Sequence, residues 1–226
     1  MKRLEPTILN EIPFKVNLEQ LFTRLKMKQD SEYAERVIEL AKEAENVGRP
    51  KAVFNTTYIE EKGDDYIVVE GVKFASRILR TNIGDAQKVF PFLVTCGAEL
   101  AEWAKGKEDM LDAFTVDIIQ QLACKTAREA VSEEIIKNNG IEHISKMNPG
   151  SLADWPLSEQ KNLFRLFKGR EAQIGVVLTD CYLMVPVKSV SGIWFSKEIR
   201  FENCQLCQRP DCPSRVTDYN PCTCDK

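Results

Sequence analysis

Residues Met184–Ser196 read MVPVKSVSGIWFS, and this β-branched and aromatic run predicts a strand in the protein core. Shortly before it, Ile174–Asp180 reads IGVVLTD and is also strand-like. Further upstream, Lys146–Gln160 reads KMNPGSLADWPLSEQ, whose Asn, Pro, Gly and Ser content predicts a loop. Taken alone, these patterns indicate a surface loop anchored in the core by Trp155 and a core strand with a bulge at Gly192.

Helical and strand-like patterns alternate irregularly in the rest of the chain. Apolar periodicity predicts helices over 18–27, 33–47 and 109–138, and a short helix after Ser158 as its N-cap. In the longest helix, the predicted apolar stripe is Leu111, Phe114, Ile118, Leu122 and Val131. A hairpin is expected around the KGDD turn at 62–65, and VFPFLVTC at 89–96 predicts a buried strand in which Pro91 favours an edge or a bulge. The pattern predicts an α+β fold, a single domain with an antiparallel sheet flanked by helices.

The three quoted segments, in their order and spacing, resemble the activation (reactivation) domain of cobalamin-dependent methionine synthase. That family has an Arg-x-x-Pro-Gly loop, then an Ile-Gly-x-x-Leu-Thr strand, then a Met-x-Pro-x-x-Ser-Val-Ser-Gly stretch. The match runs over Lys146–Ser196, and Gly71–Asn139 fits loosely. The resemblance implies an activation-type domain over residues 1–200. The pattern predicts that residues 1–15 are extended or poorly ordered and that residues 201–226 form a Cys-rich tail.

The resemblance also implies a groove for S-adenosylmethionine. Its expected lining is the loop at Pro149, Gly150 and Ser151 and the strand at Ser189, Ser191 and Gly192. A Pro-Gly loop lets backbone groups approach a ligand closely, because glycine has no side chain. Lys146 is expected to hold the methionine carboxylate of the ligand.

Several positions depart from the family pattern. Lys146 stands where the family has Arg, so a point charge replaces a bidentate guanidinium. Ser151 stands where the family has Tyr, and Cys124 falls at a ligand-facing acidic position of the long helix. The family's early acidic, tryptophan-containing motif has no counterpart in this sequence.

Cysteines crowd the C-terminal end of the chain. The pair Cys204-x-x-Cys207 has the spacing of two ligands of one metal, Cys212 is the predicted third ligand, and Cys222 or Cys224 the fourth. An iron–sulfur cluster and a structural zinc both fit the pattern, and the alternatives are free thiols or a disulfide. The other cysteines, Cys96, Cys124 and Cys181, are predicted to be small buried side chains.

Composition excludes several classes of function. The chain has 226 residues, 43% of them hydrophobic and 29% charged, with a formal net charge of −3, so no basic excess predicts nucleic-acid binding. No apolar run approaches membrane-spanning length, and the N-terminus lacks a signal-peptide pattern, which favours the cytoplasm. There is no phosphate-binding Gly-rich loop and no Asp-x-His-x-x-Gly cobalamin motif, and the single histidine, His143, indicates no hydrolase.

The resemblance implies a stand-alone reactivation module. It would bind S-adenosylmethionine for the reductive remethylation of cob(II)alamin on a partner, a corrinoid-dependent methionine synthase that lacks its own activation domain. The chain would contact cobalamin only when the partner carries it, and a separate protein could donate the electron. The chain would then be a component of a methyltransferase system and not an independent catalyst. The alternative is an iron–sulfur or zinc protein that acts through its C-terminal cysteines without binding S-adenosylmethionine.

Overall fold

Strand β6 is the centre of the sheet. The computed structural model describes residues 5–196, 203–207, 209, 211–212, 215 and 217–220. Among these, eight strands form one sheet in which all pairings are antiparallel. The strands are β1 (Thr7–Leu9), β2 (Lys51–Phe54), β3 (Thr57–Lys62), β4 (Tyr66–Val69), β5 (Val72–Ala75), β6 (Lys88–Thr95), β7 (Ile144–Met147) and β10 (Ser189–Ser196). On one side β6 pairs with β2 and β3, and on the other with β10, which in turn pairs with β7.

Pro91 lies in this central strand, so the expectation of an edge position was wrong. The strand tolerates a proline because its partner is interrupted at that point. β2 ends at Phe54, opposite Phe92, and β3 begins at Thr57, opposite Val89. Pro91 therefore faces the gap between β2 and β3, where its carbonyl accepts a hydrogen bond from the Asn55 N–H (2.9 Å). The missing proline N–H falls where no ladder bond is needed.

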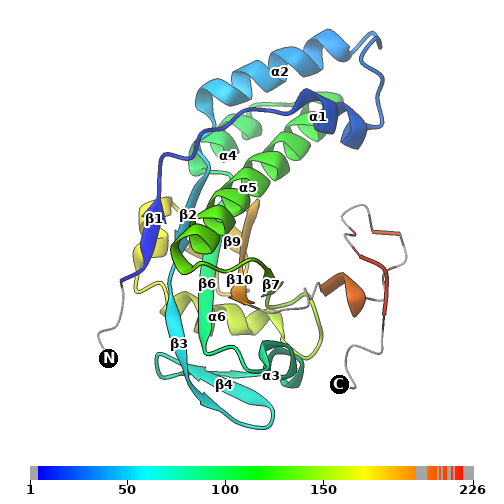
Figure 1. The fold of residues 1–226 in the computed structure, drawn as a ribbon. Helices are drawn as coiled ribbons and strands as arrows, with labels where there is room; N and C mark the ends of the chain where they lie inside the picture. Colours follow the sequence, from blue (N-terminus) through cyan, green and yellow to red (C-terminus); the bar gives the residue numbers. More distant parts are fainter. Residues whose placement is uncertain are drawn as a thin grey trace.

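Helices cover both faces of the sheet and create two cores. The helices are α1 (Leu18–Leu25), α2 (Ala34–Val47), α3 (Arg77–Ile83), α4 (Ala98–Lys105), α5 (Met110–Asn139) and α6 (Gln160–Arg165), with short 3₁₀ turns η1 (Leu157–Glu159), η2 (Arg170–Ile174) and η3 (Asn203–Gln205). Figure 1 shows α5 crossing one face of the sheet, with α1, α2 and α4 around it. Phe92 and Trp194 stack in the core on this face (4.1 Å between ring centroids), and the core on the opposite face contains Phe74, Trp155 and Phe167. The predicted fold class is therefore confirmed.

The long helix begins as predicted, at an Asp109 cap whose carboxylate accepts the backbone N–H groups of Leu111 (2.9 Å) and Asp112 (3.0 Å). The predicted apolar stripe holds from Ile118 onward, but Leu111 and Phe114 are 50% and 52% exposed. A helix keeps its apolar face buried only where another element covers it. The start of α5, which carries Leu111 and Phe114, extends beyond the elements that cover the rest of the helix.

The segment before β10 is not one strand. Ile174 ends η2, and β8 (Val177–Leu178) forms a separate two-stranded sheet with β9 (Met184–Val185). The Val185–Pro186 peptide bond is cis, and β10 begins only at Ser189. The expectation of a helix capped by Ser158 was also wrong, because Ser158 lies within η1 and α6 has no side-chain cap.

Candidate functional site

The Pro-Gly loop is held by contacts on both sides of its turn. Gly150 has φ +82°, a conformation that L side chains rarely adopt, and its N–H donates to the Trp155 carbonyl (2.7 Å). Trp155 is fully buried edge-on to Phe74, which confirms it as a core anchor. Asp154 accepts hydrogen bonds from the Ser76 hydroxyl and from the Ile78 N–H (3.0 Å), at the N-terminus of α3. These contacts fix the shape of the loop.

The loop meets β10, as the resemblance implied. β7 pairs with β10 only over Ile193–Ser196, and at Asn148 the chain turns across the rest of that strand. The Asn148 side-chain amide donates to the Ser191 carbonyl (2.6 Å). A Cβ at Gly192 would lie 2.5 Å from the Met147 carbonyl oxygen, so only glycine permits this approach. The β6–β10 register runs through Gly192 without a shift, and the expected bulge is absent from it.

The predicted site residues lie on two faces of the sheet. Lys146 is paired with Trp194, whose ring belongs to the core under α5, so the half-buried Lys146 lies on the α5 face. Ser189 and Ser191 alternate with these residues and lie on the α6 face. There the Ser189 hydroxyl donates to the Pro186 carbonyl (2.7 Å), and the Ser191 hydroxyl lies 3.4 Å from Gln160 Oε1. Both serines are buried and bonded within the protein, so their backbone, not their hydroxyls, faces the loop.

A cavity of about 560 Å³ opens on the α5 face next to the start of β10. Its walls come from α4 (Ala98, Ala101), from α5 (Val116, Asp117, Gln120) and from the segment Val185–Lys188, and Gly175 also borders it. Lys188 bridges the two sides through an ion pair with Asp117 (2.7 Å). The second and third sequence motifs therefore meet here, although neither predicted the helices that complete the cavity.

Cys96 and Cys124 are buried beneath this face. Burial raises the pKa of Cys96 to about 12 and that of Cys124 to about 11. Both thiols are therefore neutral at physiological pH, and Cys124 cannot replace the charge of an acidic residue. The prediction of burial is confirmed for these two cysteines but was wrong for Cys181, which is exposed.

The described part of the Cys-rich tail is organised around a guanidinium. Arg215 donates to the carbonyls of Cys204 (3.0 Å), Cys207 (3.1 Å) and Thr217 (3.2 Å). Within the described ranges, no three His, Cys, Asp or Glu side chains lie close enough together to hold a metal ion. Cys204, Cys207 and Cys212 therefore do not form a metal-ligand cluster there. The other two predicted ligands, Cys222 and Cys224, lie outside the described residues.

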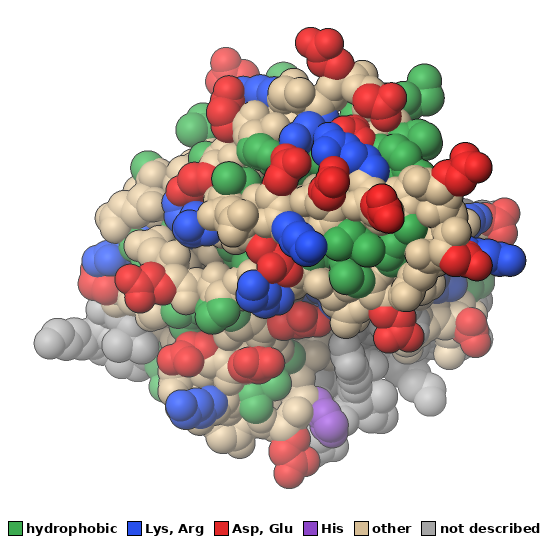
Figure 2. Space-filling view, turned by 90° about the horizontal axis from the view of Figure 1, so that it is seen from above, with side chains coloured by type: hydrophobic (Ala, Val, Ile, Leu, Met, Phe, Trp, Pro, Cys, Tyr) green, Lys and Arg blue, Asp and Glu red, His purple; other side chains and the backbone are tan. Residues whose placement is uncertain are grey.

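Surface charge is mixed on the face that carries α2. Figure 2 shows acidic and basic side chains interspersed there, without a basic stripe. Over the described residues, no helix is both long and apolar enough to cross a bilayer.

Fold and loop together define an α+β domain whose antiparallel sheet is crossed by a Pro-Gly loop at β10. The sequence model of the family "Vitamin B12 dependent methionine synthase, activation domain" matches residues 145–209. The chain is similar in structure to the MetH reactivation domain solved in a crystal bound to AdoHcy. The TM-score is 0.58 and the sequence identity 18%, and the match covers 88% of this chain and 81% of that one. The resemblance to the activation domain family is thus confirmed. A search of curated proteins gave no significant match.

Sequence reasoning missed Asp154 and Lys188 as parts of this site. Asp154 was inside the quoted loop, and an Asp in a loop is a common helix cap, but the sequence does not identify α3 as the helix it caps. Lys188 was inside the third motif, and its partner Asp117 is on a helix far away in the chain. Each residue takes part in the site through a partner distant in sequence, α3 for Asp154 and Asp117 for Lys188, and only the folded chain shows these contacts.

Proposed function

We propose that this protein binds S-adenosylmethionine and serves in the reductive reactivation of a cobalamin-dependent methionine synthase carried on a separate polypeptide. The match to the activation domain family supports the role, and the similar solved domain is bound to AdoHcy. The observation that carries the proposal is the meeting of the Pro-Gly loop with β10, with Lys146 on the adjoining edge strand.

The proposed ligand lies along the β7–β10 edge on the α5 face. Over Ser189–Gly192, β10 has only β6 as a strand partner among the described strands, so its other edge borders the loop. Backbone groups of this edge and of Gly150 are the expected partners of the ligand's polar atoms. Lys146 is the expected partner of its carboxylate, as a point charge.

Catalysis in this proposal is positioning. S-adenosylmethionine, when bound, supplies an electrophilic methyl group to the reduced corrinoid of the partner. The residues of this chain hold the ligand's carboxylate, orient its sulfonium and keep water away from it. No general acid or base is assigned to the chain, which agrees with the neutral, buried state of Cys124.

The proposed docking surface for the partner is apolar and borders the cavity of about 560 Å³. It consists of Met110, Leu111 and Phe114 at the start of α5, and of Val185 and Val187 before β10; Met110 and Val187 are 83% and 78% exposed. Exposed apolar side chains that form one patch are typical of interaction sites, and the proposal is that these five side chains form such a patch. Their position beside the cavity would bring a docked corrinoid towards the ligand.

Calorimetric titration with S-adenosylmethionine tests the proposal directly. We expect saturable binding that weakens at least tenfold in Lys146→Ala, because the carboxylate loses its counter-charge. The control is Lys42→Ala, which removes the same charge from an exposed position on α2. The proposal fails if the unaltered protein shows no binding, or if both variants bind equally well.

The tail is the subject of a separate proposal. Cys204, Cys207, Cys212 and a fourth cysteine, Cys222 or Cys224, hold a metal through which the partner receives its electron. The visible spectrum and metal content of anaerobically purified protein test it. Brown absorbance with stoichiometric iron would support an electron-transfer role. Stoichiometric zinc in a colourless protein would assign the tail a structural role, and protein free of metal would refute the proposal.

A further inference from the structure

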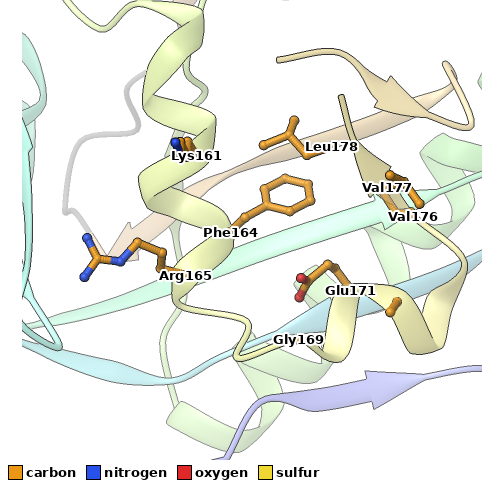
Figure 3. Close-up of a pocket in the computed structure, with 9 residues that line it drawn as sticks. Lys161, Phe164, Arg165, Gly169, Glu171, Val176, Val177 and Leu178 are labelled. Atoms are coloured by element: carbon orange, nitrogen blue, oxygen red, sulfur yellow. The ribbon is translucent and has the colours of Figure 1, made fainter. Parts of the chain in front are cut away.

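A second cavity, of about 500 Å³, lies on the α6 face of the sheet, away from the proposed ligand edge. Its apolar wall is made by Phe164 from α6 and by Val176 and Leu178 around β8. Glu171 enters it from η2 on the opposite side. In Figure 3 the Glu171 carboxylate points toward the space beside the Phe164 ring, and Leu178 lies next to that ring. One charged group thus faces an otherwise apolar wall.

One oxygen of the Glu171 carboxylate has no hydrogen-bond donor among the described residues. Its Oε2 atom is buried and accepts no hydrogen bond from any residue that the structure describes. The cations next to it in the chain are engaged elsewhere, because Lys168 pairs with Glu70 (3.2 Å) and Arg170 with Glu5 (3.3 Å). A buried carboxylate oxygen without a donor is energetically unfavourable, and a ligand that supplies a donor would remove that penalty.

Two cations of α6 also border the cavity. Lys161 and Arg165 form no ion pair with any described residue, and Figure 3 shows Arg165 directed away from Phe164. Lys161 lines the cavity one helical turn before Phe164, and it is the cation that the proposal assigns to a ligand lying against the ring. The cavity presents a carboxylate, an ammonium and an apolar wall in one place.

We propose that this cavity binds a free α-amino acid with an apolar side chain. The ligand's ammonium would donate to Glu171 Oε2, its carboxylate would pair with Lys161, and its side chain would lie between Phe164 and Leu178. A zwitterion matches both charges, and a volume of about 500 Å³ accommodates a molecule of this size. The site lies on the opposite face of the sheet from Lys146 and does not depend on the proposed function.

Three related compounds separate the parts of the proposal in calorimetric titrations of the full chain. Phenylalanine carries all three groups, phenethylamine lacks the carboxylate, and 3-phenylpropionate lacks the ammonium. We expect phenylalanine, or the smaller leucine or methionine, to bind at least tenfold more tightly than either truncated compound. Phenethylamine binding as tightly as phenylalanine would overturn the zwitterion assignment, and no binding of any of the three amino acids at 10 mM (roughly 2.7 kcal/mol of binding free energy) would overturn the site.

Substitutions locate the site. Glu171→Gln should weaken phenylalanine binding at least tenfold, and Lys161→Gln should weaken it several-fold. Glu142→Gln, at an exposed position, is the matched control for Glu171, and Lys146→Ala should leave phenylalanine binding unchanged. Unfolding in urea is measured in parallel. If Glu171→Gln and Arg165→Gln both lower stability and neither changes binding, Glu171 pairs internally with Arg165 and the proposal is wrong.

Discussion

At the scale of single residues, the candidate site depends on contacts that hold its loop. Gly150 supplies the positive φ, Trp155 anchors the loop in the core, and Asp154 ties it to α3. Lys146, in contrast, lies on edge strand β7, opposite Trp194 on the α5 face. The residues that shape the loop and the residue that would bind the ligand are therefore different, and substitutions can separate them.

Asp154→Ala should destabilise the protein and loosen the loop. The carboxylate caps α3 and accepts the Ser76 hydroxyl, and loss of such a cap costs about 1 kcal/mol. We expect a lower midpoint in urea unfolding and weaker binding of S-adenosylmethionine, while Lys146→Ala should weaken binding alone. Asp180→Ala, at an exposed position, is the control. Unchanged stability in Asp154→Ala would show that the loop does not depend on this contact.

The buried cysteines should resist alkylation. Because the pKa values of Cys96 and Cys124 are raised to about 12 and about 11, neither forms appreciable thiolate at pH 8, and burial also blocks access. Iodoacetamide labelling of native protein, read by peptide mass spectrometry, should modify the exposed Cys181 and spare these two. All three should react in denaturant. Rapid native labelling of Cys124 would contradict its buried state.

At the scale of elements, a charged network joins α2 to α5. Asp112 in the first turn of α5 accepts hydrogen bonds from Arg36 (2.6 Å) and from the Tyr33 hydroxyl. Glu43, also on α2, pairs with Lys107 (2.7 Å). Hydrogen bonding by Arg36, and further by Tyr33, holds the pKa of Asp112 below its ordinary value. This network positions the end of α5 that carries the proposed docking surface.

Acid should therefore weaken the packing of α2 on α5. A carboxyl group with a lowered folded-state pKa adds stability above its unfolded pKa of about 3.9, and that stability is lost as the pH falls through the folded pKa. Asp112→Asn should lower the free energy of unfolding by about 2 kcal/mol at pH 7, and by much less at pH 2. Urea unfolding at both pH values checks this. An equal loss at pH 7 and pH 2 would exclude a charge-dependent role.

At the scale of the whole molecule, the sheet separates two functional faces. The α5 face has the Pro-Gly edge, the cavity of about 560 Å³ and the exposed apolar start of α5. The α6 face has the second core and the cavity at Glu171. Leu206, in the described part of the tail, packs against this second core. Binding of S-adenosylmethionine and partner docking are thus proposed for the α5 face, and amino-acid binding for the α6 face.

The double substitution Leu111→Asp with Phe114→Asp should weaken partner docking. Both side chains are about half exposed, so charge is tolerated in the free protein but opposes an apolar interface. We expect at least a tenfold loss of affinity for the corrinoid methionine synthase, measured by calorimetry, with unchanged binding of S-adenosylmethionine. Val177→Asp, exposed on β8, is the control. Unchanged partner affinity would place docking elsewhere.

From the sequence alone, local patterns predicted most elements, the α+β class and the family. Apolar periodicity and caps such as Asp109 are local, and the motif over Lys146–Ser196 is contiguous enough to be recognised without coordinates. The same locality explains the errors. Pro91 indicated an edge because the break between β2 and β3 lies far away in the chain, and Leu111 and Phe114 fitted an apolar stripe that no neighbouring element covers.

Only the tertiary structure decided which groups share a site. The motif placed Ser189 and Ser191 beside Lys146, but strand alternation puts their side chains on the other face, where Gln160 and the Pro186 carbonyl engage them. Gly192 is required because Asn148 crosses β10 there. Glu171 Oε2 has no donor among the described residues, because the cations next to it in the chain pair with Glu70 and Glu5. Such relations depend on packing between segments distant in sequence. Periodicity and spacing along the chain carry no information about them.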